Sequence, residues 1–308
     1  GNPEALVNVK KEFGENPYEL QNILKYWVRS KNDDLKVIPT DSIVMKVDKE
    51  AVRRSGMMIP GDSIPDYMHI SLKGKRALYK SELMMLEMLA EANWERPIYM
   101  AVSVGTENHL GMGNHFVQEG LTYRFTPFDT EKTGVKLDSE KMYDNLMNKF
   151  KFGGIDKEGI YIDENAMRMC YSHRRIFSQL IGQLIREGKT DKAKAALEYA
   201  EKMIPAYNVP YDWQNGAMQM AEAYYQLGEK EKGDNIMKAL ADKAVEYLTW
   251  YLSLDDQRFA MSSHEVVDYQ LPILSTEVKL MQKYNSELAP VYDSKLNELY
   301  QMCVDRMK

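Results

Sequence analysis

An internal repeat in the second half of the chain leaves few folds open to it. The stretches GKTDKAKAALEYAEKMIP (188–205) and GEKEKGDNIMKALADKAV (228–245) align at an offset of 40 residues. Each follows a run with helical spacing of apolar residues, so each unit is predicted to be a helix, a glycine turn and a second helix. Such a unit cannot bury its apolar face alone and must stack on a neighbour. The second half is therefore predicted to be all-helical.

The first repeat unit resembles a known family, the tetratricopeptide repeats. Its small residues, turn glycine and closing proline have the spacing of the second half of such a repeat: Gly188, Ala193, Leu197, Ala200 and Pro205. The second unit departs from the pattern, because Gly233 stands where alanine is expected and no proline closes it. The helical segments 276–284 and 291–307 are predicted to form a third, degenerate hairpin. Arrays of this kind mostly present a surface to a peptide or protein partner.

The first half has a different pattern. Helical spacing over 17–30, 79–93 and 138–150 alternates with strand-like runs at 37–48, 67–74 and 98–104, which are separated by Pro, Gly and Asp. The run IYMAVSV (98–104) is predicted to be a buried strand because it is apolar, rich in β-branched residues and short. We therefore expect an α+β protein.

The two halves are predicted to be separate domains. Strand-like runs stop near residues 154–164, so we expect a mixed α/β domain at 1–160 and a helical, tetratricopeptide-like domain at 161–308.

Composition excludes several classes of protein. The 40 basic and 46 acidic residues are mixed along the chain, which gives no basic stripe and argues against nucleic acid. Cys170 and Cys303 lie far apart and outside any CxxC spacing, so neither a zinc site nor a disulfide framework is indicated. No run of 18 apolar residues occurs. Because the chain begins Gly-Asn-Pro rather than Met, we expect a processed or excised part of a longer protein.

The segment 105–119 (GTENHLGMGNHFVQE) carries the residues that most suggest chemistry. Its glycines match neither a P-loop nor a dinucleotide fingerprint, but the segment follows a predicted strand, where ligands often bind. His109, His115 and Glu119 are candidate ligand-binding residues. On a helix, His115 and Glu119 would share a face, yet the paired histidines of a zinc protease motif are absent. The alternative is that the imidazoles bind loop carbonyls and Glu119 lies at an exposed turn.

Other polar and aromatic groups allow two interpretations each. Tyr211, Trp213 and Tyr225 belong to an aromatic-rich segment that either packs between helices or forms a groove for peptide or sugar. The cluster from His173 to Arg175 either binds a phosphate or pairs with acidic residues just upstream. Adjacent carboxylates such as Asp255 and Asp256 are interpreted as caps and solvated turns rather than as a glycosidase pair. We expect no catalytic residue, no metal and no cofactor in this chain.

A second resemblance covers most of the chain, from about residue 15 to residue 260. The segments PTDSIVMKVDKEAV, NWERPIYMAVSVG and HLGMGNHFVQEGLTYRFTP resemble the soluble C-terminal part of a family of large bacterial membrane proteins. The multi-spanning N-terminal half of that family is similar to protein O-mannosyltransferases. The resemblance implies a domain on the periplasmic side of the inner membrane, tethered through an upstream segment that this chain lacks. Family catalysis would reside in the membrane part and act on a lipid-linked sugar.

Three functions therefore stay open. The first is a non-catalytic accessory domain of a glycosyltransferase-like membrane protein, which binds a protein or peptide, including a glycan acceptor. The second is a stand-alone glycoside hydrolase or metal-dependent hydrolase with its site in the loop 105–119. The third is a scaffold whose helical groove binds peptides without any sugar.

Overall fold

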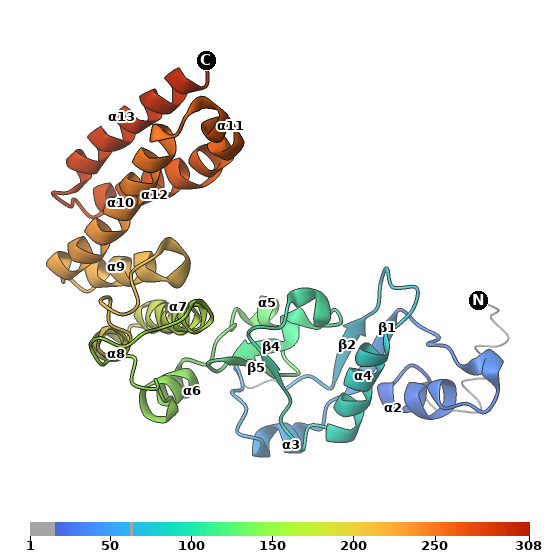
Figure 1. Ribbon diagram of the computed structural model, residues 1–308. Coiled ribbons are helices and arrows are strands. Elements are labelled where there is room, and N and C mark those ends of the chain that lie inside the picture. Colours follow the sequence, from blue (N-terminus) through green and yellow to red (C-terminus); the bar gives the residue numbers. More distant parts are fainter. Residues whose placement is uncertain (1–15, 62–63) are drawn as a thin grey trace. The chain divides into compact units, whose positions relative to one another are not determined.

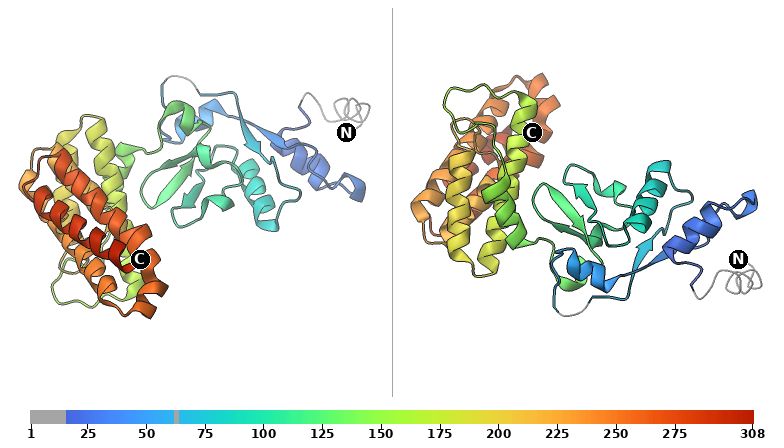
Figure 2. Two further views of the ribbon diagram at one scale, coloured as in Figure 1. Left: turned by 90° about the horizontal axis from the view of Figure 1, so that it is seen from above. Right: turned by 90° about the horizontal axis from the view of Figure 1, so that it is seen from below.

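The computed structural model describes residues 16–61 and 64–308, and its chain divides into two compact units (Figure 1). The first unit ends at Met142 and the second begins at Tyr143. The first is mixed α/β with small sheets and the second is all-helical, which confirms the predicted fold class. Two further views show the elements of each unit (Figure 2). No helix in the described parts of the chain is long and apolar enough to span a membrane.

The first unit contains two small antiparallel sheets. Strands β1 (Ser42–Lys46) and β2 (Tyr67–Ser71) pair in a register that places Val44 opposite His69. The second sheet has the order β3-β5-β4, in which β5 pairs with both neighbours. Its strands are β3 (Tyr99–Ala101), β4 (Phe116–Gln118) and β5 (Thr122–Phe125).

Short helices accompany these sheets. The predicted first helix is α2 (Leu20–Asn22), which continues as a π-helix over Ile23–Val28. Helix α3 (Lys49–Arg54), which the sequence pattern did not predict, begins at the N-cap Asp48, whose carboxylate accepts from the backbone N–H of Ala51. The others are α4 (Lys80–Ala92), α5 (Thr130–Thr133) and α6 (Ser139–Asp144), the last followed by a π-helical turn at Asn145–Lys149.

One apolar core joins the sheets to α4. The inward residues of β1 and β2 pack with Leu86 and Leu89 of α4, and with Phe116 and Phe125 of the second sheet. Trp94, just past the end of α4, stacks on Phe125 with ring centroids 5.3 Å apart and donates from Nε1 to the carbonyl of Lys46. Trp94 therefore fixes the exit of α4 against both sheets.

The second unit is built from long helices. Its helices are α7 (Glu164–Arg186), α8 (Thr190–Met203), α9 (Ala217–Gln226), α10 (Lys230–Ser253), α11 (Asp256–His264), α12 (Leu271–Lys283) and α13 (Ala289–Arg306). Helix α7 packs against α8 and α9, and α10 packs against α9, α12 and α13. The predicted hairpins are thus α7 with α8 and α9 with α10, and α12 with α13 is the third (Figure 1).

The residues of the repeat pattern lie where hairpin packing requires them. Gly188 and Gly228 have φ angles of +72° and +79° in the two turns, a conformation that L-residues with a side chain adopt at a cost. Ala193, Leu197 and Ala200 of α8 are buried, so the small side chains face the neighbouring helix. Pro205 follows the end of α8, as the pattern predicts.

The segment between residues 150 and 160, predicted to belong to the first domain, contacts the helices. Phe152 stacks on Phe177 of α7 with ring centroids 6.1 Å apart. The side-chain amide of Asn208 donates to the carbonyls of Ile155 and Lys157, and the hydroxyl of Tyr207 donates to that of Asp156. The hydrogen bonds are made with the loop after α8. Sequence periodicity does not predict them, because it describes only the helices.

Candidate functional site

The loop 105–119 is the first candidate region, and its surroundings differ from two of the sequence-based predictions. The run 98–104 was predicted to be a buried strand, but β3 covers only Tyr99–Ala101 and both of its end residues are exposed. The reason is that β3 is an edge strand, paired with β5 on one side only. His115 ends a 3-10 turn (Gly113–His115) and strand β4 follows, so His115 and Glu119 share no helix face.

One glycine of this loop, Gly111, allows a close approach of two backbones. Gly111 has a φ of +69°, and a Cβ built there would lie 2.5 Å from the carbonyl oxygen of Ser71 at the end of β2. Glycine is therefore required for steric reasons at this position. The nearest atom to a Cβ at Gly113 would lie 3.8 Å away, in the ring of His109, so that position has room. The arrangement is a structural crossover.

His109 is buried in the core of this loop. Its ring packs against Phe116 at a centroid distance of 5.1 Å, and neither ring nitrogen has a hydrogen-bond partner among the described residues. The alternative in which its imidazole binds a loop carbonyl is therefore wrong for the side chain of His109. An imidazole enclosed in this way acts as an apolar ring in the packing.

His115 lies beside a cavity of about 350 Å³. The cavity is also lined by His69 of β2, by Asn114 and by Asp129, the N-cap of α5. Burial lowers the pKa of His115, and the carboxylate of Asp129 opposes that effect. Its Nδ1 has no hydrogen-bond partner among the described residues. His115 is thus a buried imidazole at the wall of a cavity, and burial favours its neutral form, while its unpaired Nδ1 is itself enclosed.

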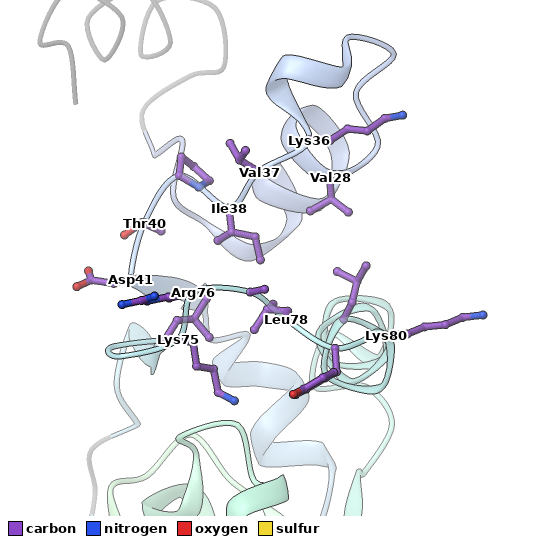
Figure 3. Close-up of a pocket in the computed structure, with 15 residues that line it drawn as sticks. Val28, Lys36, Val37, Ile38, Thr40, Asp41, Lys75, Arg76, Leu78 and Lys80 are labelled. Carbon is purple, nitrogen blue, oxygen red and sulfur yellow. The ribbon is translucent and has the colours of Figure 1, made fainter.

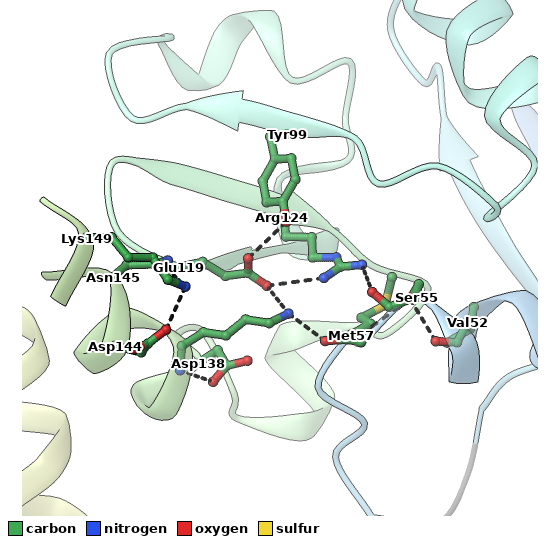
Figure 4. Close-up of polar contacts among 12 residues, drawn as sticks. Val52, Ser55, Met57, Tyr99, Glu119, Arg124, Asp138, Asp144, Asn145 and Lys149 are labelled. Carbon is green, nitrogen blue, oxygen red and sulfur yellow. Dashed lines mark hydrogen bonds and ion pairs between the residues drawn. The ribbon is translucent and has the colours of Figure 1, made fainter.

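Glu119 is the centre of a buried polar network (Figure 4). Its carboxylate accepts from Nζ of Lys141 at 3.1 Å and from the hydroxyl of Tyr99 at 3.2 Å, and it lies 3.7 Å from Nη1 of Arg124. Arg124 and Glu119 are almost fully buried. The alternative in which Glu119 lies at an exposed turn is therefore wrong, because β4 ends against α6 instead of in solvent.

The same network reaches the end of α3. Nη2 of Arg124 donates to the carbonyl of Ser55 at 2.8 Å, and Nζ of Lys141 donates to the carbonyl of Gly56 at 2.5 Å. Burial, together with the carboxylate of Glu119, raises the pKa of Tyr99. Glu119 pairs with two cations and accepts a hydrogen bond from a phenol, so its role is to link β3, β4, β5, α6 and the turn after α3.

The three candidates in the loop do not form one site. The cavity beside His115 is lined by neither His109 nor Glu119. Across residues 16–61 and 64–308, no group of three or more His, Cys, Asp or Glu side chains is placed to hold a metal ion. Both His109 and His115 have ring nitrogens without a partner among the described residues, and His115 is the one that lines the cavity.

Two of the three aromatic candidates in the helical unit take part in packing. The hydroxyl of Tyr211 donates to Glu201 at 3.0 Å, and burial with that neighbouring carboxylate raises the pKa of Tyr211. Tyr225 stacks on Tyr284 with ring centroids 4.9 Å apart, and burial, together with the Asp234 carboxylate that accepts a hydrogen bond from its hydroxyl, raises the pKa of Tyr225. Trp213 is 43% exposed and is free to contact a partner.

The basic cluster at the middle of α7 also has a structural role. Arg174 is 1% exposed, and its guanidinium donates to the carbonyls of Pro210, Ile204 and Val209 at 3.0, 2.8 and 2.6 Å. Its guanidinium also lies over the ring of Tyr211. Neither a phosphate site nor pairing with upstream acids describes Arg174. It binds the segment 204–216, which is inserted between the two repeat units and connects α8 to α9.

A second concavity of the first unit was missed by sequence reasoning. It is a groove of about 740 Å³ in the first unit (Figure 3). Its walls are the extended segment 36–41, the turn 75–79 and the first turn of α4. The signal that could have found it is the stretch LKGKRALYK (72–80), where basic and apolar residues alternate between a predicted strand and a predicted helix. We call this feature the basic groove.

Comparison with known proteins finds one similarity, which covers the first unit. No curated protein and no solved structure shows significant similarity to the chain. Residues 1–145 match one family model, which ends close to the end of the first unit at Met142. That model is described as TMEM260-associated domain 2, and the match is consistent with a domain of a membrane-protein family.

Proposed function

We propose that this chain is a non-catalytic, extracytoplasmic accessory domain of a membrane-embedded, glycosyltransferase-like protein, and that it binds a protein or peptide partner. The observation that carries the proposal is the match of residues 1–145 to TMEM260-associated domain 2. TMEM260 is related to O-mannosyltransferases, which agrees with the resemblance of the segments NWERPIYMAVSVG and HLGMGNHFVQEGLTYRFTP. An accessory domain would hold the acceptor protein or organise the complex.

The geometry supports binding better than catalysis. Glu119 is neutralised by Lys141 and Arg124, and His109 is enclosed by the core, so neither is available as an acid, a base or a nucleophile. In contrast, the basic groove offers a concave surface, and the second unit exposes aromatic side chains, Trp213 in the turn before α9 and Trp250 on α10. Both features suit a polypeptide partner.

The location that we propose is the periplasmic side of the inner membrane, with tethering through a segment upstream of this chain. A sulfhydryl-labelling experiment tests it. A single exposed cysteine introduced at Tyr161, which is 90% exposed, is expected to react in intact spheroplasts with a membrane-impermeant maleimide. Cys170 and Cys303 are buried and serve as the internal negative control. Labelling only after lysis would contradict the proposed location.

Partner binding is tested in cells by site-specific photo-cross-linking in the full-length protein. A photoreactive phenylalanine analogue at Tyr79, which is 77% exposed at the rim of the basic groove, is expected to yield a discrete cross-linked protein band. A second probe at Trp213 samples the helical unit. Probes at both positions that yield no cross-linked protein would overturn the proposed function.

The alternative function, a soluble hydrolase, has one observation in its favour. His115 lines a cavity with His69 and Asp129, and its Nδ1 is unpaired. A hydrolase would release product from a glycoside or ester substrate when the purified chain is assayed alone, and H115A would abolish that activity while leaving the circular dichroism spectrum unchanged. Such a result would replace the accessory-domain proposal.

A further inference from the structure

The basic groove has an apolar floor that belongs to the core of the first unit. Val28, Ile38, Leu78 and Leu83 line the groove and also pack against the buried core cluster. Their packing fixes the floor, so a ligand meets a preformed surface. A preformed apolar surface reduces the entropy that binding costs.

Four cations surround this floor, and two of them have no acidic partner. Lys36 pairs with Asp33, and Lys75 donates to Glu82, whose pKa that contact lowers. Arg76 and Lys80 form no ion pair and no side-chain hydrogen bond among the described residues. Asp41 is the one acidic residue among those that line the groove. In a chain with a net charge of −6, this local positive excess favours an acidic ligand.

The walls of the groove also expose unpaired backbone. Within the described residues, no backbone hydrogen bond involves the N–H or C=O groups of 37–40 or of 76–78. Both segments lack helical and strand structure. Free backbone donors and acceptors along an extended segment can pair with an added peptide strand, and pockets for alternate side chains then supply the specificity.

We propose that the basic groove binds an extended segment of a partner protein in which acidic residues alternate with apolar ones. The apolar side chains would enter the floor between Ile38 and Leu78, the backbone would pair with the segment 37–40, and the carboxylates would meet Arg76 and Lys80. An anionic membrane surface fits less well, because a planar bilayer reaches neither a concave floor nor the backbone groups behind the rim. The inference rests on the proposed partner-binding function and specifies the chemistry of the partner.

The test is a selection from a random twelve-residue peptide library against the whole 308-residue chain. Enriched peptides are expected to be acidic with interspersed apolar residues. Their binding, measured by fluorescence anisotropy, is expected to weaken at least tenfold in R76E/K80E, which corresponds to about 1.4 kcal/mol. The matched control is R96E/K136E, which changes two exposed cations of the same unit that line no part of the groove. For this control we expect the dissociation constant of the peptide to change by less than about twofold.

Each outcome separates the inference from the function on which it rests. Enriched peptides that are neutral or basic, or that bind R76E/K80E as tightly as the wild type, would overturn the inference while leaving a partner site elsewhere possible. A failure of both the selection and the cellular cross-linking would overturn the proposed function itself. Binding of phosphatidylglycerol vesicles that R76E/K80E abolishes, without enrichment of acidic peptides, would make the groove a membrane contact and would also overturn the inference.

Discussion

The two units are stabilised in different ways. In the first, strands of three to five residues and short helices are linked by the polar network around Glu119, which joins residues distant in sequence. In the second, helices of 9 to 24 residues bury continuous apolar stripes, with small residues such as Ala193 and Ala200 at the contacts. Short elements bury little apolar surface each, so polar contacts between them take a larger share of the stabilisation.

In the helical unit a buried cation plays the same part where the repeat is interrupted. The insertion after α8 has no repeat partner to pack against, and Arg174 binds three of its carbonyls. Buried charge therefore occurs in both units at the places where regular packing fails. Four variants test this comparison, and the first two should be the most destabilising.

Replacement of Arg174 should have the largest effect. R174A removes three hydrogen bonds from a charged donor and leaves three carbonyls without a side-chain partner, so we expect a loss of about 5 kcal/mol in the free energy of unfolding. Urea denaturation measures the loss, and hydrogen exchange should locate it in residues 164–226. The adjacent, exposed Arg175 is the control, and R175A should cost less than about 0.5 kcal/mol. Equal effects of the two variants would refute the role of Arg174.

Removal of Glu119 should be nearly as costly for the first unit. E119A leaves the buried guanidinium of Arg124 and the partly exposed ammonium of Lys141 without a counter-charge, and we expect a loss of about 3 kcal/mol. Hydrogen exchange should increase in residues 98–142 and stay unchanged in the helices of the second unit. E107A, at an exposed position of the same loop, is the control. An E119A variant as stable as the wild type would show that the network contributes nothing to the cohesion of this unit.

Sequence reasoning succeeded where the cause of structure is local. The helices over 177–187 and 218–227, their glycine turns and the third hairpin follow from periodicity, which neighbouring residues determine. For the first unit, the sequence predicted strands from their alternating apolar and polar residues, but it did not predict which strands pair. Tyr99 is exposed because β3 lies at the edge of its sheet. That position depends on the order of the strands and not on the run IYMAVSV.

The candidate site shows the same limit more clearly. His115 was chosen for its chemistry and does line a cavity, but its neighbours His69 and Asp129 come from β2 and α5. Glu119 was grouped with His115 by spacing, whereas its partners are Tyr99, Arg124 and Lys141. The basic groove joins two segments about 40 residues apart in sequence. Contacts of this range depend on the tertiary fold, so no single stretch of sequence encodes them.

The third variant concerns a buried carboxyl in the helical unit. Glu277 of α12 is 1% exposed, and its Oε2 has no partner among the described residues. Burial, reinforced by the carboxylate of Asp212, raises its pKa from 4.5 to about 8. Between these values the folded protein holds a proton that the unfolded chain releases, so this residue makes stability fall as pH rises from 4.5 towards 8.

E277Q should remove that dependence. The variant is expected to match the wild type near pH 5 and to exceed it by about 3 kcal/mol at pH 8, and the difference should level off about one pH unit higher. The measurement is urea denaturation over the pH range 5 to 9. The control is E298Q at an exposed position of α13, which should shift stability equally at every pH. A wild-type curve that runs parallel to that of E277Q would show that Glu277 is ionised in the folded state.

The smallest effect tests the departure of the second repeat unit from its pattern. Gly233 stands where alanine is expected, and a Cβ built there would lie 2.7 Å from Cε1 of Tyr225. The ring cannot retreat, because it stacks on Tyr284 and its hydroxyl donates to Asp234. G233A should therefore cost about 1 kcal/mol, although alanine normally stabilises a helix interior by about that amount.

The matched glycine of α7 should respond in the opposite direction. At Gly182 an added Cβ meets only Nη1 of Arg186 at 3.6 Å, the end of a flexible side chain. G182A should therefore stabilise the protein by up to about 1 kcal/mol. Both variants are measured by urea denaturation, and the double variant Y225A/G233A should show that the cost of G233A disappears with the ring. If G233A stabilised the protein as G182A does, the aromatic stack between α9 and α12 would not explain why this repeat lacks its alanine.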